Sequence, residues 1–539
     1  TKIRILMETN YFKSVNKKIF YSLFLVSMLI GNSFDMMAQV KVPFKQRTSN
    51  ATPTKKIYSV KGDFSMMGNT NLTLVTYGDD RDNSNRDMKY VDVDNDASTW
   101  NSSSSNLTFS NENGAIPSCS NIVYAGLYWT GRSSDGADSP NVFTATKYVP
   151  GIQTINNNLD IRHGNAVENT NYTMTISRGG NENNRYPIYT FTNGSSSYVF
   201  RFTKNNNTDA VSVSKNNGNY INVPVSVYTD NYGRRIADFN SPYEIENGDV
   251  TIKINSLRKI TTESGSTSDY QDSPNRANVN VVGTINGVVP VTKTYDKRKV
   301  SLKGPSATNY TTITANTNDI YYPTSGDGFM YSGYAEVTDY VRQNGIGQYT
   351  VADIALVEGN GTTTGFYGGW SLVVVYENSK MKYRDVTVFD GHAYVAGNVT
   401  AEFELPISGF NAIQNGPVNM KLGVMAGEGD KNISGDYFQI QKNSDNSWMN
   451  LSHSDNAENN FFNSSIYTGG NTRNPNFVNN TGLDISVFSI PNANNSVIAN
   501  GQTATKFKYG STQDTYVIFA TVMSVDAYVP EIEGILTTT

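Results

Sequence analysis

Short runs in which apolar and polar residues alternate constrain the fold of this chain more than any other feature. Residues 250–254 alternate Val, Ile and Ile with Thr and Lys, so every second side chain can face a core while the others face water. A period of two is typical of half-buried β-strands. The pattern recurs at residues 172–176 and 222–228, where Pro224 cannot donate a ladder hydrogen bond and therefore predicts an edge strand.

Two runs are apolar on both faces, residues 371–376 (SLVVVY) and 516–522 (YVIFATV), which predicts central strands of a sandwich. A helical spacing of apolar residues is clear only over residues 336–344, which Gly345 can terminate. The segments between strands are rich in Asn and Ser, which favour turns. We therefore expect an all-β fold: antiparallel β-sandwiches with long Asn/Ser-rich loops and one short helix.

Composition excludes several classes of function. A net charge of -5 provides no overall field to hold nucleic acid. The single cysteine, Cys119, excludes an internal disulfide and a cysteine-based metal cluster, and three histidines leave little material for triad chemistry. The sequence contains no GxSxG, HExxH or GxxxxGK[ST] motif. We expect no enzymatic activity and no nucleic-acid partner.

The first 38 residues have the pattern of an export signal. Three lysines between residues 13 and 18 precede an apolar run at 19–30, which is shorter than the roughly 20 residues that span a bilayer. Cleavage after Ala38 would make Gln39 the first mature residue. No later run is long enough to cross a membrane, so we expect an extracellular or cell-surface protein without a membrane-spanning segment after the signal.

Six blocks of sequence resemble the N-terminal β region of large Bacteroidetes cell-surface and gliding-motility-type adhesins, multi-repeat proteins linked to type IX secretion. The blocks are YAGLYWTG (124–131), YAEVTDYV (334–341), YTVADI (349–354), GFYGGWSLVVVY (365–376), RDVTVFDGH (384–392) and GVMAGEGDKNISGD (423–436). The resemblance extends in order and spacing through residues 300–530. It departs from the whole family architecture, because the repeats and the sorting domain are missing here. It carries over no catalytic residue.

The resemblance implies a discontinuous domain. We expect a β-sandwich built from residues 39–140 and 298–530, an inserted β-rich region at 141–297, and the start of a linker at 531–539 that leads to a missing downstream part. Within the blocks, Trp129 and Trp370 lie near glycines, and we expect both to anchor the core. Gly368 and Gly369 permit a close approach between strands there.

Two acidic segments are candidate calcium sites. Asp92, Asp94 and Asp96 place three carboxylates at alternate positions, and calcium prefers such oxygen ligands. This is not an EF-hand loop, because Ala97 and Ser103 occupy the positions that require Gly and Glu. A solvated acidic turn remains the alternative.

The second candidate joins Glu428, Asp430 and Asp436 in a loop whose glycines would let it wrap an ion. Lys431 could instead neutralise these carboxylates, and a plain hairpin turn is the alternative. A calcium ion is the only cofactor that either segment suggests.

The function expected from these observations is that of a non-catalytic, exported cell-surface adhesion or binding module, the N-terminal part of a larger surface protein. Tyr- and Asn-rich loops would contact surface glycans or proteins. Two alternatives stay open: a secreted carbohydrate-binding or carbohydrate-active protein, and a structural spacer.

Overall fold

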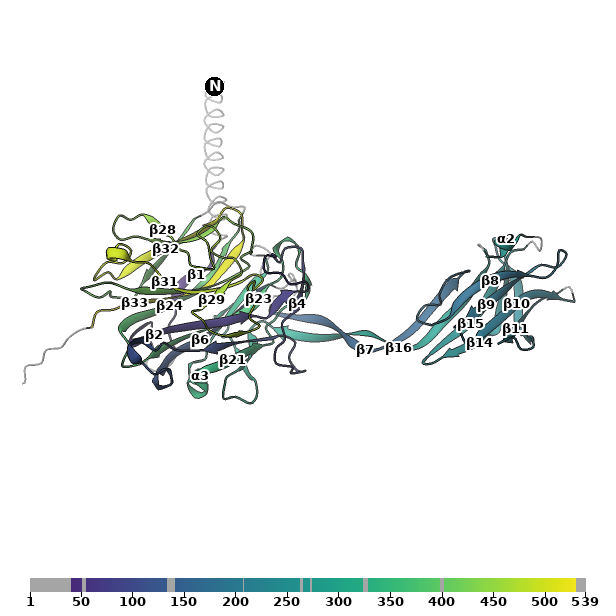
Figure 1. The fold of residues 1–539 in the computed structure, drawn as a ribbon, viewed down its shortest axis with the longest axis horizontal. Coiled ribbons are helices and arrows are strands. Elements are labelled where there is room, and N and C mark those ends of the chain that lie inside the picture. Colours follow the sequence, from purple (N-terminus) through teal and green to yellow (C-terminus); the bar gives the residue numbers. More distant parts are fainter. Residues whose placement is uncertain are drawn as a thin grey trace, which may run out of the picture. The chain divides into compact units, whose positions relative to one another are not determined.

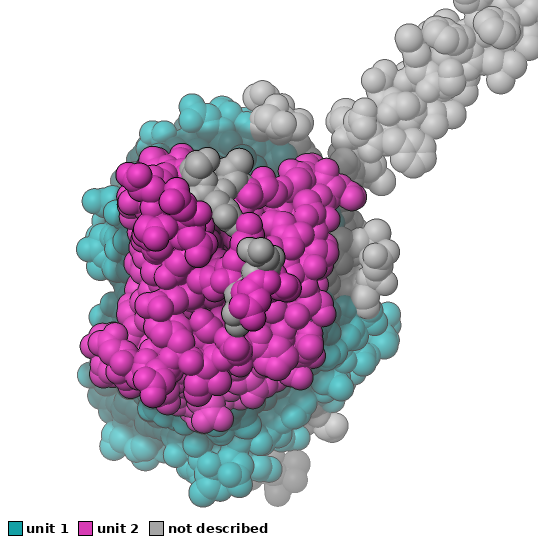
Figure 2. Space-filling view, turned by 90° about the vertical axis from the view of Figure 1, so that its right-hand side faces the viewer, with its two compact units in different colours: residues 1–145, 293–539 teal, residues 146–292 magenta. Residues whose placement is uncertain are grey.

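The computed structural model describes residues 40–50, 55–132, 141–206, 208–261, 265–271, 274–322, 328–397 and 402–529. The chain forms two compact units: residues 1–145 with 293–539 make unit 1, and residues 146–292 make unit 2 (Figure 1; Figure 2). Unit 2 falls inside the range 141–297, which the family resemblance implies is an insertion. The expected signal segment, 1–38, and linker, 531–539, lie outside the described residues.

Strands make up 55% of the structure and helices 5%, which confirms the all-β class. Unit 1 is organised by an 11-stranded sheet in which only the short pair β29–β31 is parallel. In spatial order its strands are β19 (Ile320–Tyr321), β20 (Met330–Glu336), β6 (Asn121–Arg132), β23 (Gly368–Glu377), β2 (Ile57–Thr70), β24 (Tyr383–Val395), β33 (Tyr516–Asp526), β26 (Met420–Gly427), β31 (Leu483–Ser489) and β29 (Ile466–Tyr467), with β1 (Val40–Gln46) paired to β24.

The long strand β2 joins two halves of this sheet. Residues 57–61 pair with β24, whereas residues 62–70 pair with β23. The change of partner occurs at Gly62, where a Cβ atom would lie 2.0 Å from the carbonyl oxygen of Tyr376. The two halves pack on each other through a core that includes Phe64, Val373 and Val522.

Three smaller sheets complete unit 1. They comprise β18 (Thr311–Thr314), β17 (Lys299–Lys303), β21 (Gly347–Ala352), β5 (Ser102–Leu107) and β30 (Arg473–Asn474); then β22 (Gly359–Asn360), β4 (Asp87–Tyr90) and β3 (Leu72–Leu74); and β25 (Phe403–Ser408), β32 (Ala504–Ser511), β27 (Asp436–Gln441) and β28 (Trp448–Asn450). The sheet that contains β5 and β21 covers the outer face of the half that contains β23. The sheet that contains β27 and β32 covers the half that contains β33.

This layering explains why two strands are apolar on both faces. In β23, Leu372 and Val374 enter the core beneath the β5–β21 sheet, whereas Val373 and Val375 enter the core between the halves. Every residue of β33 is buried. The predicted central position of residues 371–376 and 516–522 is confirmed.

Trp129 and Trp370 are the core anchors that the sequence predicts. They are 1% and 0% exposed and lie opposite each other in the β6–β23 pair. Each indole N–H has a partner: Trp129 donates to the carbonyl oxygen of Lys297 (2.8 Å), and Trp370 donates to the hydroxyl of Ser103 (2.8 Å). The expected close approach is also present, because a Cβ at Gly369 would lie 2.4 Å from a backbone oxygen of β2.

Unit 2 is a sandwich of two five-stranded antiparallel sheets. One contains β12 (Ile221–Val223), β11 (Thr208–Lys215), β10 (Ser197–Asn205), β9 (Tyr186–Thr192) and β8 (Thr173–Gly179); the other contains β13 (Val225–Thr229), β14 (Arg235–Asn247), β15 (Val250–Lys259), β16 (Arg276–Asp296) and β7 (Val142–Ile161). The chain enters unit 2 along β7 and leaves it along β16 (Figure 1). Phe200 of one sheet meets Phe239 of the other edge-on, with ring centroids 6.1 Å apart.

The predicted strand at 222–228 is two strands. β12 ends at Val223 and β13 begins at Val225, and the two belong to different sheets. Pro224, which has no N–H to donate, lies at the point where the chain changes sheet. Both strands lie at the edge of their sheet, so the edge position is confirmed while the single strand is not.

The predicted helix at 336–344 is α3 (Thr338–Asn344), and Gly345 ends it with a φ of 72°. A second short helix, α2 (Thr267–Gln271), was not expected. Asp390–Gly391 is a common turn pair, so the sequence by itself predicts a turn here with His392 in a loop. Instead all three lie within β24, where a register shift against β33 absorbs them, and the side chain of His392 is buried. A bulge and a turn favour the same residues, which explains the error.

Replacing Trp370 by alanine should lower the free energy of unfolding by about 3–5 kcal/mol, because it leaves a cavity and removes the N–H that donates to Ser103. Urea denaturation measures this. Trp448→Ala is the matched control. Trp448 is only half-buried on β28, so this variant should lose markedly less free energy of unfolding. Equal losses would contradict the assignment of Trp370 as a core anchor.

Candidate metal centre

Five acidic side chains meet where three neighbouring strands of unit 1 begin or end. Gly427, the last residue of β26, pairs with Leu483 of β31 and with Val517 of β33. This register brings Glu428 and Asp430, which follow β26, next to segments distant in sequence. The five acids are Glu428, Asp430, Asp436 at the start of β27, Asp484 in β31 and Asp514 just before β33.

Glu428, Asp430 and Asp514 form the centre of the cluster. One carboxylate oxygen from each lies within 4.8 Å of the other two, and no other described His, Cys, Asp or Glu residues form such a group. The three residues are 1%, 3% and 1% exposed. Oxygens that bind one calcium ion at 2.3–2.6 Å must lie within about 5 Å of each other, so the spacing fits an ion of this size.

The backbone fixes these side chains in place. The Asp430 amide donates to a carboxylate oxygen of Asp514 (3.0 Å), and the Thr515 amide donates to the other (2.8 Å). Glu428 has a φ of 77°, a left-handed conformation that costs a residue with a side chain of order 1 kcal/mol. Its N–H is bound by the carbonyl oxygen of Gly482 (2.5 Å), so contacts with a second segment hold it there.

Asp436 and Asp484 adjoin the central three acids. The Phe462 amide donates to Asp436 (2.6 Å) and the Ser465 amide donates to Asp484 (3.0 Å), so one loop contributes a backbone N–H to each. The second oxygen of each carboxylate is buried and has no hydrogen-bond donor among the residues that the structure describes. That oxygen of Asp484 faces the backbone of Gly429, at 2.7 Å from where a Cβ would stand.

Burial raises the pKa of every acid in the cluster. It raises the pKa of Asp430 to about 7, with a further contribution from Asp82, and that of Asp436 to about 7. Burial, followed by repulsion from neighbouring carboxylates, raises the pKa of Glu428 and Asp514 well above the ordinary value. Buried carboxylates that repel each other need either protons or a cation.

The structure brings together part of the second predicted site and adds to it. Glu428 and Asp430 meet as the sequence suggests, and Asp436 lies beside them, but the third central acid is Asp514. Sequence reasoning missed Asp514 and Asp484, because only strand register brings them to this loop. One signal was present: Asp484 interrupts the apolar start of a strand, LDISVFS.

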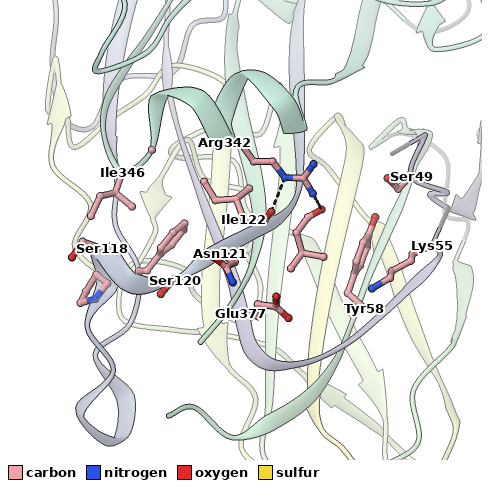
Figure 3. A pocket seen from close by; sticks show the side chains of 14 residues that line it. Ser49, Lys55, Tyr58, Ser118, Ser120, Asn121, Ile122, Arg342, Ile346 and Glu377 are labelled. Atoms are coloured by element: carbon pink, nitrogen blue, oxygen red, sulfur yellow. Dashed lines mark hydrogen bonds between the residues drawn. The ribbon is translucent and has the colours of Figure 1, made fainter. Parts of the chain in front are cut away.

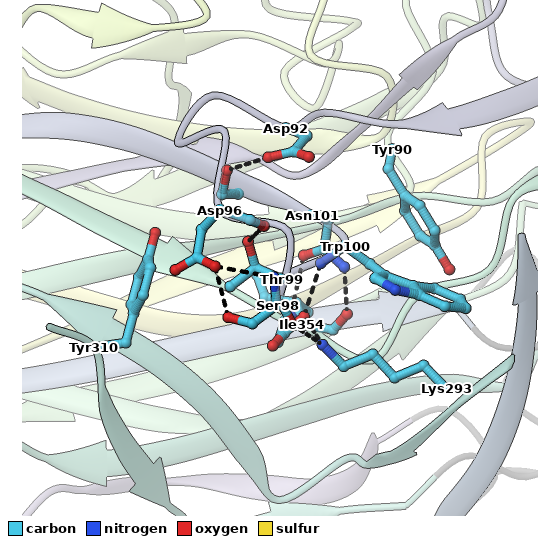
Figure 4. A network of polar contacts seen from close by, with 12 residues as sticks. Tyr90, Asp92, Asp96, Ser98, Thr99, Trp100, Asn101, Lys293, Tyr310 and Ile354 are labelled. Carbon is cyan, nitrogen blue, oxygen red and sulfur yellow. Dashed lines mark hydrogen bonds and ion pairs between the residues drawn. The ribbon is translucent and has the colours of Figure 1, made fainter. Parts of the chain in front are cut away.

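The first predicted site, Asp92, Asp94 and Asp96, is not gathered into a comparable group (Figure 4). Its carboxylates are bound by hydroxyl groups of the same chain: Asp92 by Ser102 (3.0 Å), Asp94 by Thr99 (3.1 Å) and Tyr310, and Asp96 by Ser98 (2.7 Å). Asp96 is exposed. The geometry is that of a hydrogen-bonded acidic turn.

A polar groove of about 730 Å³ runs beside α3 and the start of β6 (Figure 3). Arg342 lies along it and donates to the carbonyl oxygens of Ile122 (2.9 Å) and Val123 (3.2 Å). These contacts direct the guanidinium toward the wall of the groove.

A second buried polar cluster surrounds Arg47. Its Nε and Nη1 atoms contact Asp390 (2.5 Å) and Asp319 (2.7 Å), and the Tyr128 hydroxyl also donates to Asp390 (3.0 Å). Nearby, the His392 ring stacks on Tyr321 with centroids 3.9 Å apart. The adjoining cavity is only about 70 Å³, so little space remains beside these groups.

No protein-family model and no curated protein matches this chain. Among solved structures, it is similar to PNGF-II in the C2 space group with 9% identity and a TM-score of 0.18, over 77% of this chain and 100% of the other. It is also similar to PNGF-II in the P21 space group with 9% identity and a TM-score of 0.15, over 67% of this chain and 99% of the other. TM-scores this low carry no argument about fold or function.

His453 should make unit 1 less stable in acid. Burial lowers its pKa from 6.5 to about 4. Below about pH 6.5, His453 therefore binds a proton in the unfolded chain but not in the folded chain. The free energy of unfolding decreases as the pH falls from about 6.5 to about 4. We expect the melting temperature of wild type to drop more than that of His453→Gln between pH 7 and 4.5. Calorimetry in saturating calcium measures both melting temperatures across this pH range. Equal decreases in the two proteins would contradict the prediction.

Proposed function

We propose that this chain is a non-catalytic, exported cell-surface binding module and that unit 2 carries a contact surface for a surface glycan or protein. The observation that carries the proposal is a run of exposed aromatic side chains along the edges of both sheets of unit 2. Tyr220, Tyr228 and Tyr232 are 36%, 47% and 83% exposed, and all three lie on or beside β12 and β13.

Two of these tyrosines, Tyr220 and Tyr232, are held in place although they are exposed. The Arg201 guanidinium lies over the ring of Tyr220 at 3.6 Å from its centroid, and Arg234 lies 4.7 Å from that of Tyr232. Such cation–π contacts limit the motion of a ring that keeps its other face open. Tyrosine adds contact area with few rotatable bonds, which suits a recognition surface.

The edge strands offer a second means of contact. β12 and β13 each pair on one side only among the described strands, so their outer backbone groups face away from the sheet. Edge strands can bind an extended segment of a partner through main-chain hydrogen bonds. The exposed rings and the free edges therefore support one binding surface.

The proposed location rests on the sequence of residues 1–38. In the described part of the chain, no helix combines the length and apolar character that crossing a membrane requires. The surface location predicts that the protein outside the producing cells begins at Gln39. N-terminal sequencing of that protein tests this, and a chain that keeps residues 19–30 and stays inside the cell would contradict it.

The binding surface is tested with the triple variant Tyr220→Ala/Tyr228→Ala/Tyr232→Ala of the full chain. We expect its affinity for the glycan or cell-surface protein bound by wild type to fall at least about tenfold, or 1.4 kcal/mol. Glycan arrays and binding to cell-surface extracts identify the ligand class, and titration measures the loss.

The matched control is Tyr148→Ala/Tyr528→Ala, which removes one exposed tyrosine from β7, at the sheet edge opposite β13, and one from unit 1, and which should bind as wild type does. Wild type that binds nothing on either panel would favour a spacer. Cleavage of a glycan would favour the carbohydrate-active alternative, and either result would overturn the proposal.

A further inference from the structure

We propose that Glu428, Asp430 and Asp514 hold one calcium ion that unit 1 requires for its stability at neutral pH. The inference goes beyond the proposed function, because it concerns the fold of unit 1 and stands whether or not unit 2 binds a ligand.

Charge and burial carry the first step. The three central carboxylates and their two neighbours are all at most 3% exposed. Arg132 is a cation whose charge acts on Glu428. Its guanidinium is already used by the carbonyl oxygens of Gly328 (2.7 Å), Gly361 (2.6 Å) and Gly365 (2.8 Å). Ionised acids at this depth need a counter-charge that the described side chains supply only in part.

A second observation is independent of the acids' proximity to each other. Asp436 and Asp484 are 0% and 2% exposed, and one oxygen of each has no donor in the described structure. Buried oxygens of this kind almost always have a partner. The oxygen of Asp484 faces Gly429, the residue between two of the central acids. Water molecules on a bound ion would supply the missing donors.

The chemistry of the donors selects the ion. All five side chains offer carboxylate oxygen, and neither histidine nor cysteine belongs to the group. Oxygen-only sites favour calcium, magnesium or manganese over zinc and copper. Calcium accepts six to eight ligands in flexible geometry, whereas magnesium demands a near-ideal octahedron of shorter bonds. Irregular loops that contribute several carboxylates suit calcium better.

The ion would connect segments that no covalent link joins. The loop after β26, the turn before β33 and the start of β31 meet at the site, and the side-chain amide of Asn432 reaches the backbone oxygen of Asp80. Losing the ion would leave the central acids to repel each other at the ends of β33, β26 and β31, the last of which lies next to the edge strand β29. The edge of the large sheet would loosen first.

Calcium titration of the full chain, stripped with EDTA and dialysed, tests the inference. We expect one ion per chain by calorimetry and a melting temperature about 3 °C or more higher at a hundredfold excess over Kd. Terbium should give sensitised emission, because the ring of Tyr367 lies against Gly427 beside the site. Magnesium at equal concentration should give a smaller shift.

The variant Asp514→Asn separates a bound ion from protonated acids. Removing one central charge should weaken calcium binding at least tenfold and so cut the melting shift at the same calcium concentration to about half or less. Without calcium, the same variant relieves repulsion but loses one of the two oxygens that accept from the Asp430 and Thr515 amides, so the difference in melting temperature with and without calcium is the readout. Asp484→Asn is the second variant, should Asp514→Asn fail to fold, and should also reduce the shift.

Asp96→Asn is the matched control, since it removes an acid from the exposed turn and should leave both stoichiometry and melting shift unchanged. Three results would overturn the inference: a wild-type chain that gives no heat and no shift with calcium, an Asp514→Asn variant that responds as wild type does, or loss of the response in Asp96→Asn.

Discussion

The structure of unit 1 depends on strands that bury both of their faces. β23 and β33 each send alternate side chains into two different cores, so the halves of the large sheet can pack on each other and still be covered on the outside. This arrangement requires a strand that passes between the halves. β2 does so at Gly62, where the close approach of a neighbouring carbonyl leaves no room for a side chain.

The acidic cluster follows from the same sheet. Because β26, β31 and β33 are adjacent and in fixed register, the loops at their ends converge at one place. The large sheet therefore provides rigid strands that position the side chains, while the loops provide the carboxylates. A metal ion at such a point would stabilise the edge of the sheet, which is where neighbouring strands have the fewest partners.

Unit 2 uses a simpler plan, two sheets around one core, and its edges remain available for contact. Pro224 ends one edge strand and lets the next begin in the opposite sheet, so a single segment lines both edges. The exposed tyrosines of that segment are therefore close in sequence and share the same local framework. The proposed division of roles assigns stability to unit 1 and recognition to unit 2.

Local patterns in the sequence determined much of the outcome: the all-β class, the strands with two buried faces, the tryptophan anchors and the helix before Gly345. Each depends on side-chain period, size or turn chemistry within about ten residues. Only the tertiary structure decided the rest. His392 lies in a strand because β24 pairs with β33 and β1 through a bulge at this point, and Asp514 joins Glu428 because strand register brings together loops distant in sequence. Register arises from packing over the whole sheet, so no single segment encodes it.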